Sequence, residues 1–147
     1  MKVFLSLPMS GRTDEEIWDD IFEMNKYVLE NKEAFGIKED EKWDVTHNML
    51  TEPELDLFDL IDDVKHKNLL YLGAAIIKLA QCDAVLFSNG WNNARGCVIE
   101  HEVCMQYGIP TFYISENKVL SQEKLSEQAE KFLGSLYNDI FAKGESK

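Results

Sequence analysis

Short apolar runs alternate along the chain with stretches in which hydrophobic residues recur every three or four positions. Apolar runs of four or five residues bounded by polar or turn-forming residues are typical of strands. The four predicted strands are Lys2–Ser6, Trp43–Thr46, Asp83–Phe87 and Pro110–Ile114. Recurrence at three and four positions is typical of helices. It predicts five helices, over residues 13–32, 51–68, 69–81, 95–107 and 121–142.

Polar residues mark the ends of some of these helices. Thr13 followed by Glu16 has the spacing of a capping box at the start of the first helix. Asn93 is a suitable N-cap for the fourth helix, and Gly108 a suitable C-cap. The third helix, Leu69–Gln81, is apolar almost all round, which predicts that it packs on several sides.

The alternation of strands and helices predicts one three-layer α/β domain spanning residues 1–147. Its parallel sheet of four or five strands is expected to be covered by helices on both faces. Ligands bind such sheets beyond the carboxyl ends of the strands, near the point where the strand order reverses. The loops expected there are Leu7–Arg12, His47–Asn48 and Ser88–Ala94, with a fourth after Ile114.

The charge of the chain restricts its partners. Lysine and arginine number 15 against 27 aspartates and glutamates, giving a net charge of −12. This surface repels phosphate backbones and anionic lipid surfaces, so we expect neither a nucleic acid polymer nor a membrane as partner. The chain also contains no apolar run long enough to cross a bilayer, and no signal peptide is recognisable.

The three cysteines point to a reducing compartment. Cys82, Cys97 and Cys104 are odd in number and have no CxxC spacing, which favours free thiols in the cytoplasm. Cys97, Cys104 and His101 share one helix face, but this spacing is more typical of core packing than of a metal site. We therefore predict neither a metal nor a cofactor.

The chain has only two arginines, Arg12 and Arg95, and each adjoins a glycine at a junction between loop and helix. Arginine suits bidentate recognition of phosphate or carboxylate, and helix N-termini add free N–H groups. We interpret these loops as the binding site of a small anionic ligand; the alternative is two solvated arginines. The predicted ligand-binding residues are Ser6, Met9, Ser10, Gly11, Arg12, Asn89, Trp91, Asn92, Asn93, Arg95 and Gly96.

Glu100 is the candidate catalytic residue. It follows the start of the fourth helix by about one and a half turns, among the apolar residues Val98, Ile99 and Val103. A partly buried carboxylate near the mouth of a loop is suited to act as nucleophile or base. The alternative is a surface glutamate like Glu102.

Roles can also be assigned to three further residues, two of them with alternatives. Trp91 would either stack on a ligand or anchor its loop in the core. His47, at a strand end, would contact ligand or serve as a hydrogen-bonded structural histidine. Asp83 begins a strand at the opposite end of the sheet, so we assign it a structural role.

Four segments resemble the nucleoside 2-deoxyribosyltransferase superfamily, and in particular a bacterial and phage branch of it. The segments are Phe4–Gly11, Cys82–Val85, Gly90–Glu100 and Tyr107–Pro110. The resemblance implies a flavodoxin-like or Rossmann-like domain, often homo-oligomeric, that cleaves or exchanges an N-glycosidic bond. Glu100 matches the catalytic nucleophile, which would attack C1′ of a deoxyribose. The Ser10–Arg12 loop would hold the sugar or its 5′-phosphate.

The sequence departs from that family at positions where the resemblance implies polar groups. Phe4 replaces a tyrosine, Ala74 or Ala75 an aspartate, and Ala94 an aspartate or serine. Losing several such groups lowers the rate by orders of magnitude when they act as a unit. Asn92 or Asn93 would be a substitute for one, and Asp62 or Asp63 for the aspartate.

Two functions therefore remain open, beside a third alternative, a structural homo-oligomer with a vestigial pocket. The first is a nucleotide N-glycosidase or deoxyribosyltransferase with Glu100 as nucleophile. The second is a binding module that keeps the pocket without the chemistry and senses or sequesters a nucleotide-derived ligand. Both have a small nucleoside or nucleotide as partner.

Overall fold

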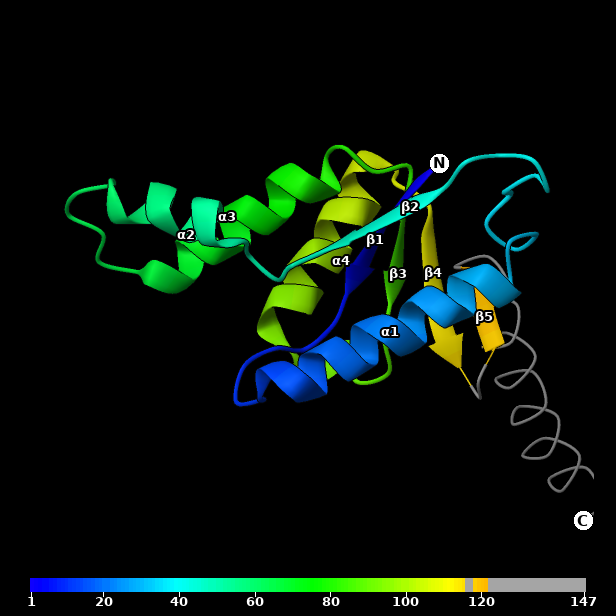
Figure 1. Ribbon diagram of the computed structural model, residues 1–147, viewed down its shortest axis with the longest axis horizontal. Helices are drawn as coiled ribbons and strands as arrows, with labels where there is room; N and C mark the ends of the chain where they lie inside the picture. Colours follow the sequence, from blue (N-terminus) through cyan, green and yellow to red (C-terminus); the bar gives the residue numbers. More distant parts are fainter. Residues whose placement is uncertain (116–117, 122–147) are drawn as a thin grey trace, which may run out of the picture.

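The computed structural model describes residues 1–115 and 118–121 as a sheet packed between helices (Figure 1). The predicted helix over residues 121–142 lies outside the described residues. The elements are β1 (Lys2–Ser6), α1 (Asp14–Glu30), β2 (Asp44–His47), α2 (Glu52–Asp59), α3 (Lys67–Leu79), β3 (Ala84–Phe87), the 3-10 helix η1 (Trp91–Asn93), α4 (Arg95–Tyr107), β4 (Thr111–Ser115) and β5 (Lys118–Ser121). Among the described residues, no helix has the length and apolar character needed to span a membrane.

The strands form one sheet in the order β2-β1-β3-β4-β5. The first four are parallel, which confirms the predicted α/β class. The fifth pairs antiparallel with β4, so the option of a fifth parallel strand is wrong. The reason is the connection, because only residues 116–117 separate the two strands. A parallel pair needs a crossover of a dozen or more residues.

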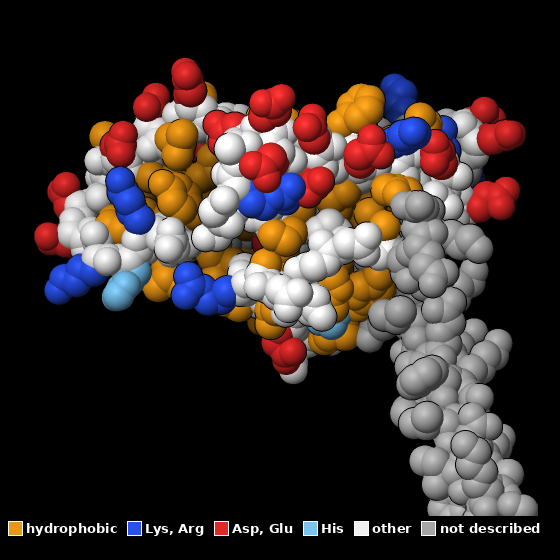
Figure 2. Space-filling view, turned by 90° about the horizontal axis from the view of Figure 1, so that it is seen from below, with side chains coloured by type: hydrophobic (Ala, Val, Ile, Leu, Met, Phe, Trp, Pro, Cys, Tyr) orange, Lys and Arg blue, Asp and Glu red, His pale blue; other side chains and the backbone are white. Residues whose placement is uncertain are grey.

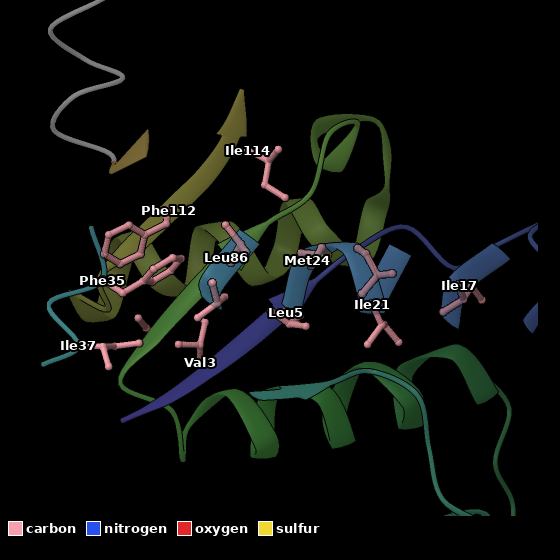
Figure 3. Close-up of a cluster of buried hydrophobic side chains, with 13 residues drawn as sticks. Val3, Leu5, Ile17, Ile21, Met24, Phe35, Ile37, Leu86, Phe112 and Ile114 are labelled. Carbon is pink, nitrogen blue, oxygen red and sulfur yellow. The ribbon is translucent and has the colours of Figure 1, made fainter. Parts of the chain in front are cut away.

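The alternating residues of β1 divide the core into two layers. Val3 and Leu5 pack on the side of α1, which contributes Ile17, Ile21, Met24 and Val28 from one stripe (Figure 3). Phe4 packs on the opposite side with Ala75 and Leu79 of α3 and Cys104 of α4. Successive side chains of a strand point to opposite faces, so Ser6 shares the α4 side with Phe4.

Of the helix caps predicted from the sequence, two are present and one is not. The predicted capping box is present, with Thr13 Oγ1 accepting from the Glu16 backbone N–H and the Glu16 carboxylate accepting from Thr13. The predicted cap at Asn93 is wrong, because Asn93 belongs to η1 and the N-cap of α4 is Ala94, which makes no side-chain hydrogen bond. Gly108 is the C-cap in the left-handed conformation, as predicted.

The segment between β2 and β3 differs most from the prediction. The helix expected over residues 51–68 ends at Asp59, and an irregular segment leads into α3. The apolar sequence of α3 predicts that this helix is packed on several sides. Within this chain it buries only Ala75 and Leu79, while Leu69 and Ile77 are more than half exposed. The helix pair projects to one side of the sheet (Figure 1), and no further layer formed by the described residues covers it.

The amino end of the sheet is closed by Asp83. Its carboxylate accepts a hydrogen bond of 2.8 Å from the backbone N–H of Lys2. Since this contact lies at the edge opposite the strand carboxyl ends, it confirms the structural role predicted for Asp83.

Candidate functional site

The carboxyl ends of β1 and β3 form the switch point of the sheet. From β1 the chain continues to β2 on one side and later to β3 on the other. In flavodoxin-like strand orders, this is where ligands bind. Ser6 ends β1, Asn48 follows β2, and Glu100 comes from the first half of α4, on the same face as Ser6.

Glu100 is fully buried at this point, with none of its surface exposed. The Ser6 hydroxyl donates to Oε2 over 3.1 Å, and the Asn48 carboxamide Nδ2 donates to Oε1 over 2.8 Å. Within the described parts of the chain, Glu100 forms no ion pair with a lysine or arginine. Of the two alternatives, the structure therefore selects the buried carboxyl and excludes a surface glutamate.

Burial changes the acidity of this carboxyl. It raises the pKa of Glu100 from 4.5 to about 7, while the hydrogen bonds from Asn48 and Ser6 act in the opposite direction. Desolvation wins because neutral donors compensate a buried charge less well than water does. Near neutral pH the group therefore exists both as an acid and as a carboxylate, which suits proton transfer or nucleophilic attack.

Two thiols of α4 flank the carboxyl along the helix. Cys97 lies one turn before Glu100 and Cys104 one turn after it, and both are buried. Burial raises the pKa of Cys97 to about 11 and that of Cys104 to about 12. At neutral pH they remain thiols, so neither is an activated nucleophile. No group of three metal-ligating side chains occurs among the described residues.

Neither predicted arginine forms a hydrogen bond or ion pair with Glu100 among the described residues. The Arg12 guanidinium donates to the carbonyl oxygens of Pro8 and Glu16, at 2.9 and 3.3 Å. It also pairs with Asp20 of α1 at 2.7 Å. An anion bound by Arg12 would therefore compete with Asp20. Arg95 is exposed at the first residue of α4.

The loop after β3 is anchored by its tryptophan. The Trp91 ring stacks on His101 with centroids 4.2 Å apart, and it also contacts Phe87 and Tyr113. These contacts fit the role of Trp91 as an anchor of its loop in the core, rather than as a residue that stacks on a ligand. Asn92, Asn93 and Gly96 are exposed, so the carboxamide that reaches Glu100 is that of Asn48.

One of the remaining predicted binding residues, Asn89, lines a separate hollow on the α1 side. Asn89, which is exposed, lines a cavity of about 190 Å³ with Ser88, Ile114 and residues of α1. Met9 packs against the α1-side core and Ser10 is exposed. Gly11 has a φ of +75°, which a residue with a Cβ adopts only with strain.

Asn48 is the site residue that sequence reasoning missed. Its position at the end of β2 was the available signal, since β2 pairs directly with β1. The carboxyl ends of both strands therefore meet at one edge, which brings Asn48 near Ser6. The neighbouring His47 packs edge-on against Trp18 at 5.1 Å. Its Nδ1 is buried and has no hydrogen-bond partner among the described residues, and burial lowers the pKa of the ring.

The apolar departures from the resemblance also have a structural place. Phe4 and Ala75 belong to one buried cluster on the α4 side of the sheet. Asp62 and Asp63 are exposed in the irregular segment before α3. Hydrophobic packing therefore occupies positions where the resemblance implies polar groups, on the sheet face that carries Ser6.

The model of a domain family of unknown function, DUF4406, matches residues 22–113, which is more than half of the chain. The match includes Asn48 and Glu100, whereas Ser6 and Arg12 precede it. No curated protein and no solved structure matches the chain.

The buried carboxyl predicts a pH-dependent stability. The pKa of Glu100 is about 7 in the folded chain against an ordinary 4.5. The tighter proton binding stabilises the fold below pH 4.5, and this contribution, about 3 kcal/mol, is lost as the pH rises through 7. Glu100→Gln has no such loss, so its free energy of unfolding relative to wild type should increase from pH 5 to pH 8.

Urea denaturation at the two pH values measures this difference. Glu102→Gln, on the exposed side of the same helix, is the matched control and should change with pH as the wild type does. An equal change in both variants would contradict the assigned environment of Glu100.

Proposed function

We propose that this chain, which belongs to the DUF4406 family of unknown function, cleaves or transfers the N-glycosidic bond of a nucleoside or nucleotide. Glu100 is the proposed nucleophile. The observation that carries the proposal is the buried Glu100 carboxyl, held by Ser6 and Asn48 at the switch point of the sheet. The resemblance to the nucleoside 2-deoxyribosyltransferase superfamily supports the same assignment.

The loss of stability caused by burying Glu100 supports a functional role for this residue. A buried carboxyl without a cationic partner destabilises the fold once it ionises. Such groups are typical of active sites, where stability is lost in favour of reactivity. The two hydrogen bonds hold both carboxyl oxygens in place, and since the carboxyl has no exposed surface, the proposed attack requires one of these contacts to open for the substrate.

The proposed reaction has two steps. A Glu100 carboxylate oxygen forms a bond to C1′ of the sugar, and the C1′–N bond breaks so that its electron pair leaves with the base. Water or a second base then attacks C1′ and releases the carboxylate. The loop residues Ser10–Arg12 are proposed to hold the sugar or its 5′-phosphate, with Arg12 exchanging Asp20 for the ligand.

A binding module is the second candidate. The observation that favours it is the hydrophobic packing of Phe4 and Ala75 on the face that carries Ser6. In this case the pocket would sense or sequester a nucleotide-derived ligand without turnover. In both cases the partner is a small molecule, because a chain with a net charge of −12 repels nucleic acid polymers.

Self-association through α3 is proposed as well, with a second copy of this chain as the partner. Residues 64–82 contain no aspartate or glutamate, although the chain has a net charge of −12. This stretch is therefore where two like-charged copies can approach with least repulsion. Hydrophobic side chains are exposed at the end of the molecule that carries α2 and α3 (Figure 2).

The spacing on α3 is self-complementary. Leu69, Gly73 and Ile77 are four residues apart and all exposed, and the position of Gly73 leaves open space where a Cβ would be. A two-fold axis at Gly73 would place Leu69 of one copy opposite Ile77 of the other. Helices that are apolar all round are normally buried, which this pairing would achieve.

Incubation with deoxynucleoside 5′-monophosphates tests the enzymatic proposal. We expect wild type and Glu102→Gln to release free base, measured by chromatography, and Glu100→Gln to lose at least a hundredfold in rate. The rate should rise with pH through about 7, because attack requires the ionised form and the pKa of Glu100 is about 7.

Thermal stabilisation by the same nucleotides separates the two candidate functions. Stabilisation without base release, reduced in Arg12→Ala, would favour the binding module over the enzyme. Absence of both release and stabilisation would contradict both functions.

Sedimentation velocity tests the proposed dimer. Ile77→Glu places charge opposite Leu69 of the other copy and is expected to convert a dimer into a monomer. Leu29→Glu is the matched control, since Leu29 is exposed to a similar extent on α1. A wild-type monomer at the highest soluble concentration, or equal effects of both variants, would rule out this interface.

A further inference from the structure

A single lysine of α3 contacts the backbone on both sides of Asn48. The Lys78 ammonium donates to the carbonyl oxygen of His47 over 3.4 Å and to that of Met49 over 3.2 Å. Its Nζ also lies 3.1 Å from the Glu54 carboxylate of α2. Lys78 is thus the point where α2, α3 and the end of β2 meet.

We propose that Lys78 is a positioning residue, which holds the Asn48 carboxamide on Glu100 by fixing the carbonyl groups of His47 and Met49. The inference rests on the proposed function of Glu100. It adds a residue that touches neither Glu100 nor, in the proposed reaction, the substrate.

The segment around Asn48 needs such a contact. β2 ends at His47, so the sheet no longer determines the backbone at Met49, and α2 begins only at Glu52. Asn48 therefore lies on a short irregular connection between two regular elements. A lysine ammonium has three donors on one nitrogen, which allows it to bind two carbonyl groups and face a carboxylate at once.

Lys78 is placed to act on Glu100 through Asn48 rather than through its own charge. The pKa of Glu100 responds to burial and to the hydrogen bonds from Asn48 and Ser6. The charged and titratable groups facing Lys78 are Glu54 of α2 and His47, and the charge of Lys78 contributes to the lowered pKa of His47. The titratable neighbours of Glu100 on α4 are Cys97 and Cys104.

A double-mutant cycle measures this coupling. The ionisation of Glu100 is followed by carbon NMR of its side-chain carboxyl in wild type, Lys78→Met, Asn48→Ala and the double variant. Losing a hydrogen bond to a charged group is expected to weaken the acidity of Glu100 by about tenfold. Lys78→Met should act in the same direction as Asn48→Ala and add nothing in the Asn48→Ala background.

The control is Lys67→Met, which removes a charge from the exposed start of the same helix and should leave the ionisation of Glu100 unchanged. Unchanged acidity in Lys78→Met, or effects of the two variants that add fully, would overturn the proposal. If Lys78→Met does not fold, Lys78→Gln replaces it, with the same expected direction and the same criterion.

This readout separates the inference from the proposed function. The NMR titration reports on the Glu100 carboxyl whether or not the protein releases base. Base release that is absent in wild type would contradict the function alone. Where release occurs, the rate of Lys78→Met should be reduced at neutral pH and recover at higher pH, because raising the pKa of Glu100 delays its ionisation.

Discussion

The hydrogen bonds to the Glu100 carboxyl are the contacts on which the candidate site depends. They join three elements that are distant in the sequence, since Ser6 ends β1, Asn48 follows β2 and Glu100 belongs to α4. Each bond exists only because β1 pairs in parallel with β2 and α4 packs on the Ser6 side of the sheet. The site is therefore a product of the topology, and moving any of the three elements would separate its groups.

The surroundings of Glu100 explain why its acidity is unusual. Two thiols flank it on α4, and Phe4 and Ala75 form part of the hydrophobic layer on the same face of the sheet. Without a cation to balance the charge, desolvation dominates and raises the pKa to about 7. The same apolar packing that weakens the likeness to a working glycosidase thus gives the carboxyl an acidity suited to neutral pH.

The charge of the chain is unevenly distributed. Its 27 aspartates and glutamates outnumber 15 lysines and arginines, and one of the two arginines, Arg12, is paired with an aspartate. The acid-free stretch on α3 carries Lys78, which faces inward to the Asn48 segment, and the apolar residues Leu69 and Ile77, which face outward. One helix therefore carries both the lysine proposed to support the site and the surface proposed to bind a second copy.

Local sequence determined the elements that depend on neighbouring residues. The strand Lys2–Ser6, the capping box at Thr13 and the C-cap at Gly108 were predictable because each follows from hydrophobic spacing or hydrogen bonds within a few residues. The sequence also singled out Glu100 as the candidate catalytic residue and Ser6 as a ligand-binding residue. Spacing alone did not reveal that the helix beginning at Glu52 ends at Asp59.

Only the tertiary structure decided which side chains share an environment. Asn48 reaches Glu100 across 52 positions of sequence, and Arg12 turns to Asp20, because strand order and helix packing set these distances. Burial of Glu100 and exposure of Glu102 likewise depend on which side of α4 meets the sheet. The sequence by itself specified the fold class and a carboxyl in the first half of a helix near the switch point of the sheet. Its acidity and its partners required the chain to fold, since desolvation and long-range hydrogen bonds have no local signature.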